Sequence, residues 1–189
     1  MDRTNFARAT SLLLALLLPA CSGLAKRPVA ADLGLDGLAC VGKVAPAFTG
    51  LSLSSNLGLV QKTRLATDKG GVCAARVFAV TAPVVLYRVF DASKPYTEFG
   101  GWWALARPSG SRDEYRAANA ICPEWSALDR LAACEIRPGT QVVLGTTQSA
   151  VCADGTSYPK SDSIQVYVPN DSRAGIVHVG NCTEETIWP

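Results

Sequence analysis

The sequence predicts an α+β domain: a small mixed or antiparallel β core with one or two short helices, stabilised by disulfides. Strand-like runs stand before and after a central helical segment, which is the order typical of this class. The 189 residues are 48% hydrophobic and 18% charged, enough to build the core of one domain, and this composition excludes a disordered chain. The net charge of +2 provides no basic surface, so we expect no nucleic-acid partner.

Residues 1–20 predict a secretory signal peptide. Arg3 and Arg8 precede an apolar run over 11–18, which is too short to cross a bilayer. The following L-P-A-C, ending at Cys21, resembles the lipobox of bacterial lipoproteins. That resemblance implies a lipid anchor at Cys21 in the cell envelope, and Ser22 after it implies the outer membrane. The alternative is ordinary cleavage, which releases a secreted protein with a free Cys21.

Six cysteines remain once Cys21 is assigned to lipid, and an even number in an exported chain predicts three disulfides. They are Cys40, Cys73, Cys122, Cys134, Cys152 and Cys182. Several connectivities are open. We favour Cys40–Cys73, which would tie the N-terminal segment to the main domain, and Cys122–Cys134, which would bracket a helical corner. No metal site is expected, because the chain has one histidine and no C-x-x-C motif.

The chain after the signal divides into two parts. Residues 21–74 are poor in charge and punctuated by glycines, which predicts a lipidated tether and a loop-rich lead-in with short strands. Residues 75–189 form the predicted compact domain, in which β-branched and aromatic runs indicate strands over 76–80 and 84–90.

The central helix has the clearest signal. Ser111 is followed three residues later by Glu114, a capping box, and Pro123 stops the helix. We expect a second short helix over 125–131. The remaining expected elements are a turn at 137–139, a polar loop over 153–160, and strands over 141–145, 164–168 and 175–180.

The sequence lacks the residues that several classes of enzyme require. There is no G-x-S-x-G motif, and the only available base, His178, lies in an expected strand, so we do not expect a serine hydrolase. No phosphate-binding loop is present. Asp113 and Glu114 fall in the first helical turn, where carboxylates serve the cap and the dipole, so they do not indicate a glycosidase pair.

A set of arginines, aromatics and one amide favours a nucleotide site: Arg88, Trp102, Trp103, Arg116 and Gln165. An arginine fork binds a pyrophosphate, an indole stacks on a flat ring, and an amide both donates and accepts at a ribose hydroxyl or a water. Each residue also has a purely structural interpretation. Arg88 and Gln165 could be solvent-exposed strand residues, and Arg116 could pair with a neighbour one helical turn away. The tryptophans could belong to the core and its rim. Strand neighbours point to opposite faces, so at most one tryptophan serves a ligand.

The order of motifs between residues 96 and 169 resembles the tuberculosis-necrotizing-toxin class of NAD glycohydrolases. The matching segments are Y-T-E-F-G-G-W-W-A-L-A-R-P-S-G, R-D-E-Y-R-A, C-E-I-R-P-G-T-Q-V-V-L-G and I-Q-V-Y-V-P. The resemblance implies an ADP-ribosyltransferase-like fold and cleavage of the nicotinamide–ribose bond, with NAD as substrate and no cofactor. It also implies that Arg88 and Arg116 bind the phosphates and that Gln165 is the catalytic amide. Trp102 replaces a usual arginine, and residues 161–163 replace usual glycines.

Three functions follow as hypotheses. The first is an exported NAD glycohydrolase acting as a toxin or effector, with an immunity protein or surface partner. The alternative is a non-enzymatic, disulfide-stabilised surface lipoprotein that binds a protein through aromatic anchors. The third is an inactive relative that binds a nucleotide in the same cleft. The enzyme needs the arginines, one tryptophan and Gln165 in one cleft, whereas the binder needs an exposed apolar patch.

Overall fold

The computed structural model describes residues 32–66 and 68–188, within a compact unit that spans Ala31–Pro189. The predicted signal peptide and the predicted lipid anchor at Cys21 lie outside the described residues. The fold class is confirmed: two short α-helices accompany mostly antiparallel strands in several sheets, with three disulfides. Among the described residues, no helix is both long and apolar enough to cross a bilayer.

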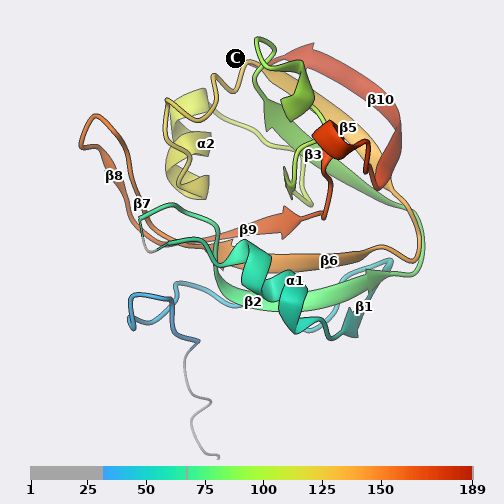
Figure 1. The fold of residues 1–189 in the computed structure, drawn as a ribbon, viewed down its shortest axis with the longest axis horizontal. Helices are drawn as coiled ribbons and strands as arrows, with labels where there is room; N and C mark the ends of the chain where they lie inside the picture. The colour runs from blue at the N-terminus through green and yellow to red at the C-terminus, as the bar shows by residue number, and fades with distance from the viewer. Residues whose placement is uncertain (1–31, 67, 189) are drawn as a thin grey trace, which may run out of the picture. The chain divides into compact units, whose positions relative to one another are not determined.

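The elements follow one another along the chain as strands with two helical insertions (Figure 1). They are β1 (Leu51–Ser54), α1 (Leu57–Thr63), β2 (Val72–Val80), β3 (Val84–Phe90), β4 (Trp102–Trp103), α2 (Arg112–Asn119), β5 (Arg130–Ile136), β6 (Gln141–Thr147), β7 (Ala150–Val151), β8 (Ser157–Tyr158), β9 (Ser161–Tyr167) and β10 (Val179–Ile187). Short 3₁₀ turns lie at Pro95–Thr97 and Ser172–Ala174.

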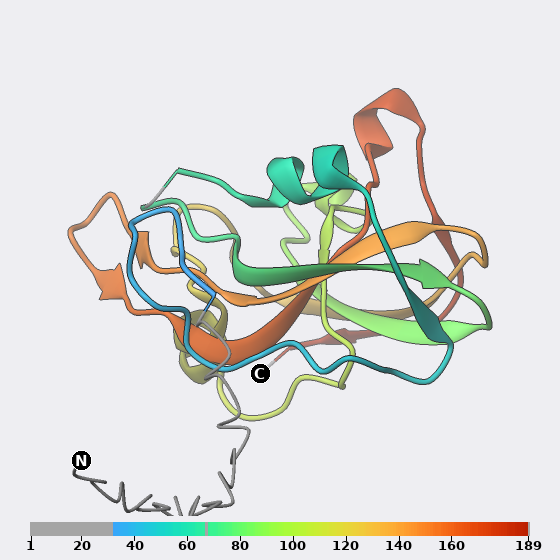
Figure 2. The ribbon, with the colours of Figure 1, turned by 90° about the horizontal axis from the view of Figure 1, so that it is seen from below.

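Two sheets enclose the core. One has the strand order β1-β2-β6-β9-β4 and the other β10-β5-β3, and an isolated bridge between Tyr87 and Ala104 links β3 to the chain just after β4. Side chains from both sheets form one buried cluster, which includes Phe78, Leu86, Ile136 and others. The alternate residues of β2 and β6 point outward, where α1 covers them (Figures 1 and 2).

The disulfides are Cys40–Cys73, Cys122–Cys152 and Cys134–Cys182. The first confirms the sequence prediction, whereas the predicted Cys122–Cys134 pair is wrong. Cys134 lies on β5, which pairs with β10, the strand that carries Cys182. Cys122 instead follows α2 and is bonded to Cys152, the residue directly after β7. Three disulfides indicate an oxidising, exported environment.

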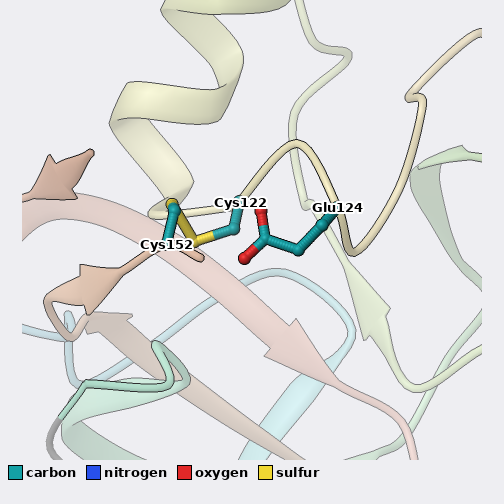
Figure 3. Close-up of side chains that lie close together, drawn as sticks. All are labelled: Cys122, Glu124 and Cys152. Atoms are coloured by element: carbon teal, nitrogen blue, oxygen red, sulfur yellow. A yellow bond between two sulfur atoms is a disulfide. The ribbon is translucent and has the colours of Figure 1, made fainter. Parts of the chain in front are cut away.

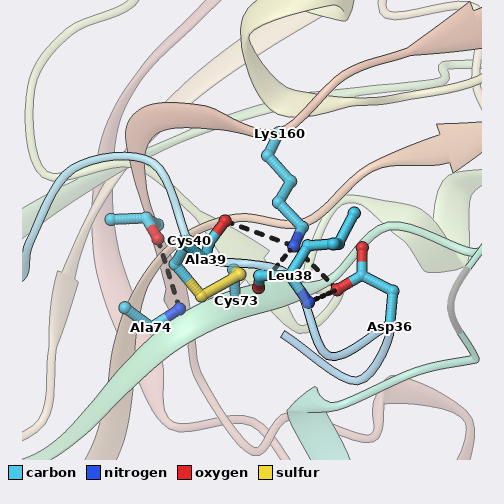
Figure 4. The surroundings of a disulfide bond; sticks show 8 residues. Asp36, Leu38, Ala39, Cys40, Cys73, Ala74 and Lys160 are labelled. Atoms are coloured by element: carbon cyan, nitrogen blue, oxygen red, sulfur yellow. Dashed lines mark hydrogen bonds and ion pairs between the residues drawn. A yellow bond between two sulfur atoms is a disulfide. The ribbon is translucent and has the colours of Figure 1, made fainter. Parts of the chain in front are cut away.

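The folded unit includes the segment that we expected to be a lead-in. β1 and α1 come from it, and β2 begins at Val72. Val44 and Leu51 belong to the main core. The loop over 32–40 is fixed at two points, by the Cys40–Cys73 disulfide and by Lys160, whose Nζ lies 2.7 Å from Asp36 Oδ1 (Figure 4).

The strands over 76–80, 84–90 and 141–145 and the capping box at Ser111 all form as predicted. The helix expected over 125–131 is wrong, because a turn and an extended segment lead there into β5. Within this segment Leu128 has a positive φ of 53°, which a helix does not allow. The last strand begins at Val179 rather than at residue 175.

Candidate functional site

A cavity of about 210 Å³ lies among α2, β3, β9 and the loop after α2. Its polar lining consists of Lys69, Arg88, Tyr115, Asn119, Ser126 and Gln165. Its apolar and aromatic lining includes Leu65, Val89, Trp102, Trp103, Ile121, Trp125 and Leu128, so both tryptophans border the cavity although only one was expected to serve a ligand. No carboxylate belongs to the lining among the described residues. The cavity therefore offers positive charge, neutral polar groups and flat rings.

Arg88 supplies the cation nearest the core. It lies on the same face of β3 as Leu86 and Phe90, because side chains two residues apart share a face. Its Nε donates to Thr97 O at 2.5 Å and its Nη1 donates to Trp102 O. Burial lowers the pKa of Arg88 to about 10, so the guanidinium stays charged at neutral pH. Both hydrogen-bond partners are neutral carbonyls, which leaves the charge available to an anionic ligand.

Close contacts with Arg88 and with Tyr167 explain the tandem glycines. A Cβ on Gly100 would lie 2.3 Å from Arg88 Nη2, and a Cβ on Gly101 would lie 2.8 Å from Tyr167 Cε2. Only residues without a side chain allow so close an approach. Thus Arg88 packs against Gly100, and Tyr167 packs against Gly101.

The two tryptophans face opposite ways, as neighbours on a strand do. The Trp102 ring packs edge-on against Tyr167, with centroids 5.1 Å apart. Trp103 is 3% exposed, donates from Nε1 to Gly100 O at 2.7 Å, and has its ring 5.9 Å from Arg88 Cζ. Trp103 therefore supports Arg88 more than it offers a face to a ligand.

Two cavity rings were absent from our sequence-based site residues. Tyr115 lies in the E-Y-R motif, so its sequence position was visible, but nothing indicated that its ring turns inward. Burial raises the pKa of Tyr115 to about 12, against the opposing effect of the Arg88 charge, so its hydroxyl stays protonated. Trp125 gave no usable signal, because its segment was predicted as helix.

Gln165 is 8% exposed and lies on β9. Its Nε2 donates to Asn119 O at 3.0 Å and to Thr147 Oγ1 at 2.9 Å, which uses both amide hydrogens. No hydrogen bond from the described residues reaches Oε1, and this atom is not among the buried unpartnered ones. The amide oxygen is thus left as an acceptor beside the cavity.

One face of β9 binds the end of α2. Ser161 Oγ donates to Ala118 O at 2.5 Å, and Ser163 Oγ donates to Asn119 Oδ1 at 3.1 Å. Ser161 and Gln165 thus satisfy two backbone carbonyls, of Ala118 and Asn119, that a helix C-terminus leaves without partners, and Ser163 binds the Asn119 side chain. The serines at positions where the resembled family usually has glycines therefore fix α2 against the sheet.

Arg116 does not line the cavity. It is 7% exposed and donates to Ser126 O at 2.6 Å, Ala127 O at 3.2 Å and Cys122 O at 3.3 Å. The structure therefore brings Arg88, Trp102, Trp103 and Gln165 together around one cavity and places the Arg116 guanidinium behind the loop that forms one wall.

Asp91 holds the same loop from the other side. Its Oδ2 accepts from Ala127 N at 3.2 Å and lies 3.2 Å from Lys94 Nζ, while Oδ1 accepts from Ser93. These hydrogen bonds, first of all the one from Ser93, lower the pKa of Asp91 to about 2. The carboxylate is 3% exposed, so it is ionised within a nearly closed shell.

Acid should therefore loosen this wall. Because the pKa of Asp91 is lower in the folded state than the usual 3.8, its contribution to stability is complete above about pH 4 and is lost as the pH falls toward 2. We expect the melting temperature to drop across this window and Asp91→Asn to flatten the drop. Thermal unfolding at successive pH values measures it, with Asp162→Asn, at an exposed position, as the control. Identical profiles for Asp91→Asn and the parent would contradict this role.

Two other groups of side chains carry no chemistry at this site. Cys122, Glu124 and Cys152 lie together (Figure 3), but the two sulfurs are bonded to each other and offer no thiolate to a metal. Glu124 Oε1 accepts from Ala153 N at 2.8 Å. His178 precedes β10 and does not line the cavity.

Comparisons with known proteins assign no family. No protein-family model and no curated protein matches this chain. Among solved structures, the structure of Tne2 in complex with Tni2 matches with a TM-score of 0.45 and 13% identity, over 64% of this chain and 94% of that chain. A likeness of this size establishes neither fold nor function.

Proposed function

We propose that the protein is an exported NAD glycohydrolase that acts as an effector, hydrolysing the nicotinamide–ribose bond of NAD. The observation that carries the proposal is that Arg88 and Gln165 line one cavity with aromatic and apolar walls. The overall reaction consumes NAD and water and yields ADP-ribose, nicotinamide and a proton. Anchoring through Cys21 and an immunity protein as partner belong to the same proposal.

The cavity suits one end of the dinucleotide. Pockets that enclose a drug-sized ligand usually measure about 300–1,000 Å³. At about 210 Å³ this cavity takes the nicotinamide ring with part of its ribose, while the phosphates stay at the mouth. Arg88 is the fixed cation that meets the phosphate next to the ribose, and Lys69, with a side chain 57% exposed, adds a second, solvated charge at the lining.

The chemistry requires no strong acid. The C–N bond breaks through an oxocarbenium-like transition state, and nicotinamide leaves as a neutral molecule. Gln165 Oε1 is the negative end of a fixed amide dipole, so it stabilises positive charge that develops on the ribose and accepts a hydrogen bond from the attacking water. Apolar walls strengthen this interaction by excluding water. Arg88 would oppose that charge at close range, so it belongs on the phosphate side of the ribose.

The direct test is nicotinamide release by the oxidised protein. Gln165→Ala should lower turnover by about 10²- to 10³-fold, the usual cost of removing one preorganised polar group from a transition state. Gln141→Ala is the matched control, because Gln141 is also a strand glutamine but binds Ser54 and Asn56 away from the cavity. A folded, disulfide-bonded parent that releases no nicotinamide would refute the proposal, and equal losses in both variants would remove the role of Gln165.

A second candidate function is protein binding by a surface lipoprotein. The loop over 33–41 exposes four apolar side chains: Leu33 at 55%, Leu35 at 49%, Leu38 at 66% and Val41 at 45%. Clustered exposed apolar residues are typical of interaction sites. A parent without NAD activity would favour this candidate.

A further inference from the structure

The orientation of the Gln165 amide is determined by what surrounds it. The oxygen and nitrogen of an amide have nearly the same shape, so hydrogen-bond partners decide which atom lies where. Asn119 O, a backbone carbonyl, can only accept. Thr147 Oγ1 donates its single hydrogen to Ser163 O at 3.1 Å, so toward Gln165 it can also only accept. A flipped amide would place Oε1 against two acceptors.

The backbone explains how the Thr147 hydroxyl acquires this direction. β6 and β9 change register between Thr146 and Thr147, so that Thr147 pairs with Ser161 whereas Thr146 pairs with Ile164. The irregularity leaves Ser163 O beside the Thr147 side chain. Such bulges often re-aim a side chain next to a functional site. Thr147 is 0% exposed, so water does not compete for its hydroxyl.

We infer that Thr147 is a positioning residue, which fixes Gln165 with its amide oxygen toward the cavity as an obligatory acceptor. The inference rests on the proposed function for its catalytic meaning. The group that meets Oε1 must then carry a hydrogen to donate, as a ribose hydroxyl or the attacking water does. An acceptor-only group, such as a carboxylate, is rejected at this point.

The test replaces the threonine in two ways. Thr147→Val keeps the shape but removes one of the two acceptors that hold the amide, so Gln165 is held by Asn119 O alone and less firmly, and kcat should fall by about 10- to 100-fold with a smaller change in KM. Thr147→Ser keeps the hydroxyl and should restore kcat to within about threefold of the parent. Thr146→Val is the matched control, because Thr146 is equally buried but its hydroxyl accepts from Ala74 N at 3.2 Å.

A second readout does not depend on turnover. In the full oxidised chain, NMR measures hydrogen exchange of the Gln165 side-chain amide, which should be slow in the parent, Thr147→Ser and Thr146→Val and faster in Thr147→Val. This pattern supports the positioning role even if no NAD is consumed, so the two proposals fail separately. Unchanged exchange in Thr147→Val would overturn the inference. Equal loss of kcat in Thr146→Val and Thr147→Val, or no rescue by serine, would also overturn it.

Discussion

Replacing Arg88 by methionine is expected to lower kcat/KM for NAD hydrolysis by about 100-fold, since truncating one partner of a buried charged pair commonly costs about 2–5 kcal/mol. The loss follows from the burial of the guanidinium, whose charge is weakly screened and whose only hydrogen-bond partners in the described residues are two carbonyls. Lys69 cannot substitute, because its side chain is 57% exposed and its charge is screened by water.

Whether the loss of kcat/KM falls on kcat or on KM shows which state Arg88 stabilises. A phosphate contact exists in both the ground state and the transition state, so the effect should fall mainly on KM. Arg88→Lys keeps a charge but loses the planar fork that reaches Thr97 O and Trp102 O, so its activity should be intermediate. The affinity for ADP-ribose, measured by calorimetry, should decrease in parallel because the product retains the phosphates.

Arg76→Met provides the control for this experiment. Arg76 is also a strand arginine, but its side chain is exposed and does not line the cavity. If Arg88→Met and Arg76→Met bind ADP-ribose equally well at a temperature where both are folded, Arg88 does not bind the phosphates.

Local signals predicted the parts of the fold that local chemistry decides. The capping box at Ser111 forms because both of its hydrogen bonds connect residues three apart. The apolar runs at 76–80 and 84–90 form strands because their residue types favour half-buried, pleated structure. Arg88 and Gln165 were selected for their chemistry and for the motif order, whereas alternation along a strand left open whether their side chains are exposed.

Long-range pairing accounts for what the sequence reasoning missed. The segment before β5 has enough apolar residues for a helix, but Arg116 donates to the carbonyls of residues 126 and 127, and Asp91 accepts from the Ala127 N–H, which holds the segment in an extended path. The partner of Cys134 depended on β5 pairing with β10, a contact between residues 48 apart in sequence. No local sequence pattern indicates which distant strands or cysteines pair.

Arg116→Met is expected to destabilise the protein by about 2–4 kcal/mol, because it leaves three carbonyls of one loop without their shared donor. For a chain of this length, that corresponds to a melting temperature lower by about 4–16 °C. Thermal unfolding measures the effect, with Arg76→Met again as the control, which should stay within about 2 °C of the parent.

The same variant separates two roles for Arg116. The family resemblance implies a phosphate ligand, which predicts lost NAD affinity with unchanged stability. The geometry instead makes Arg116 the support of the wall that carries Trp125, Ser126 and Leu128, so stability should fall first and activity should follow as the wall loosens. At low temperature, where the variant is folded, Arg116→Met should retain more activity than Arg88→Met. A variant as stable as the parent but unable to bind ADP-ribose would restore the phosphate role.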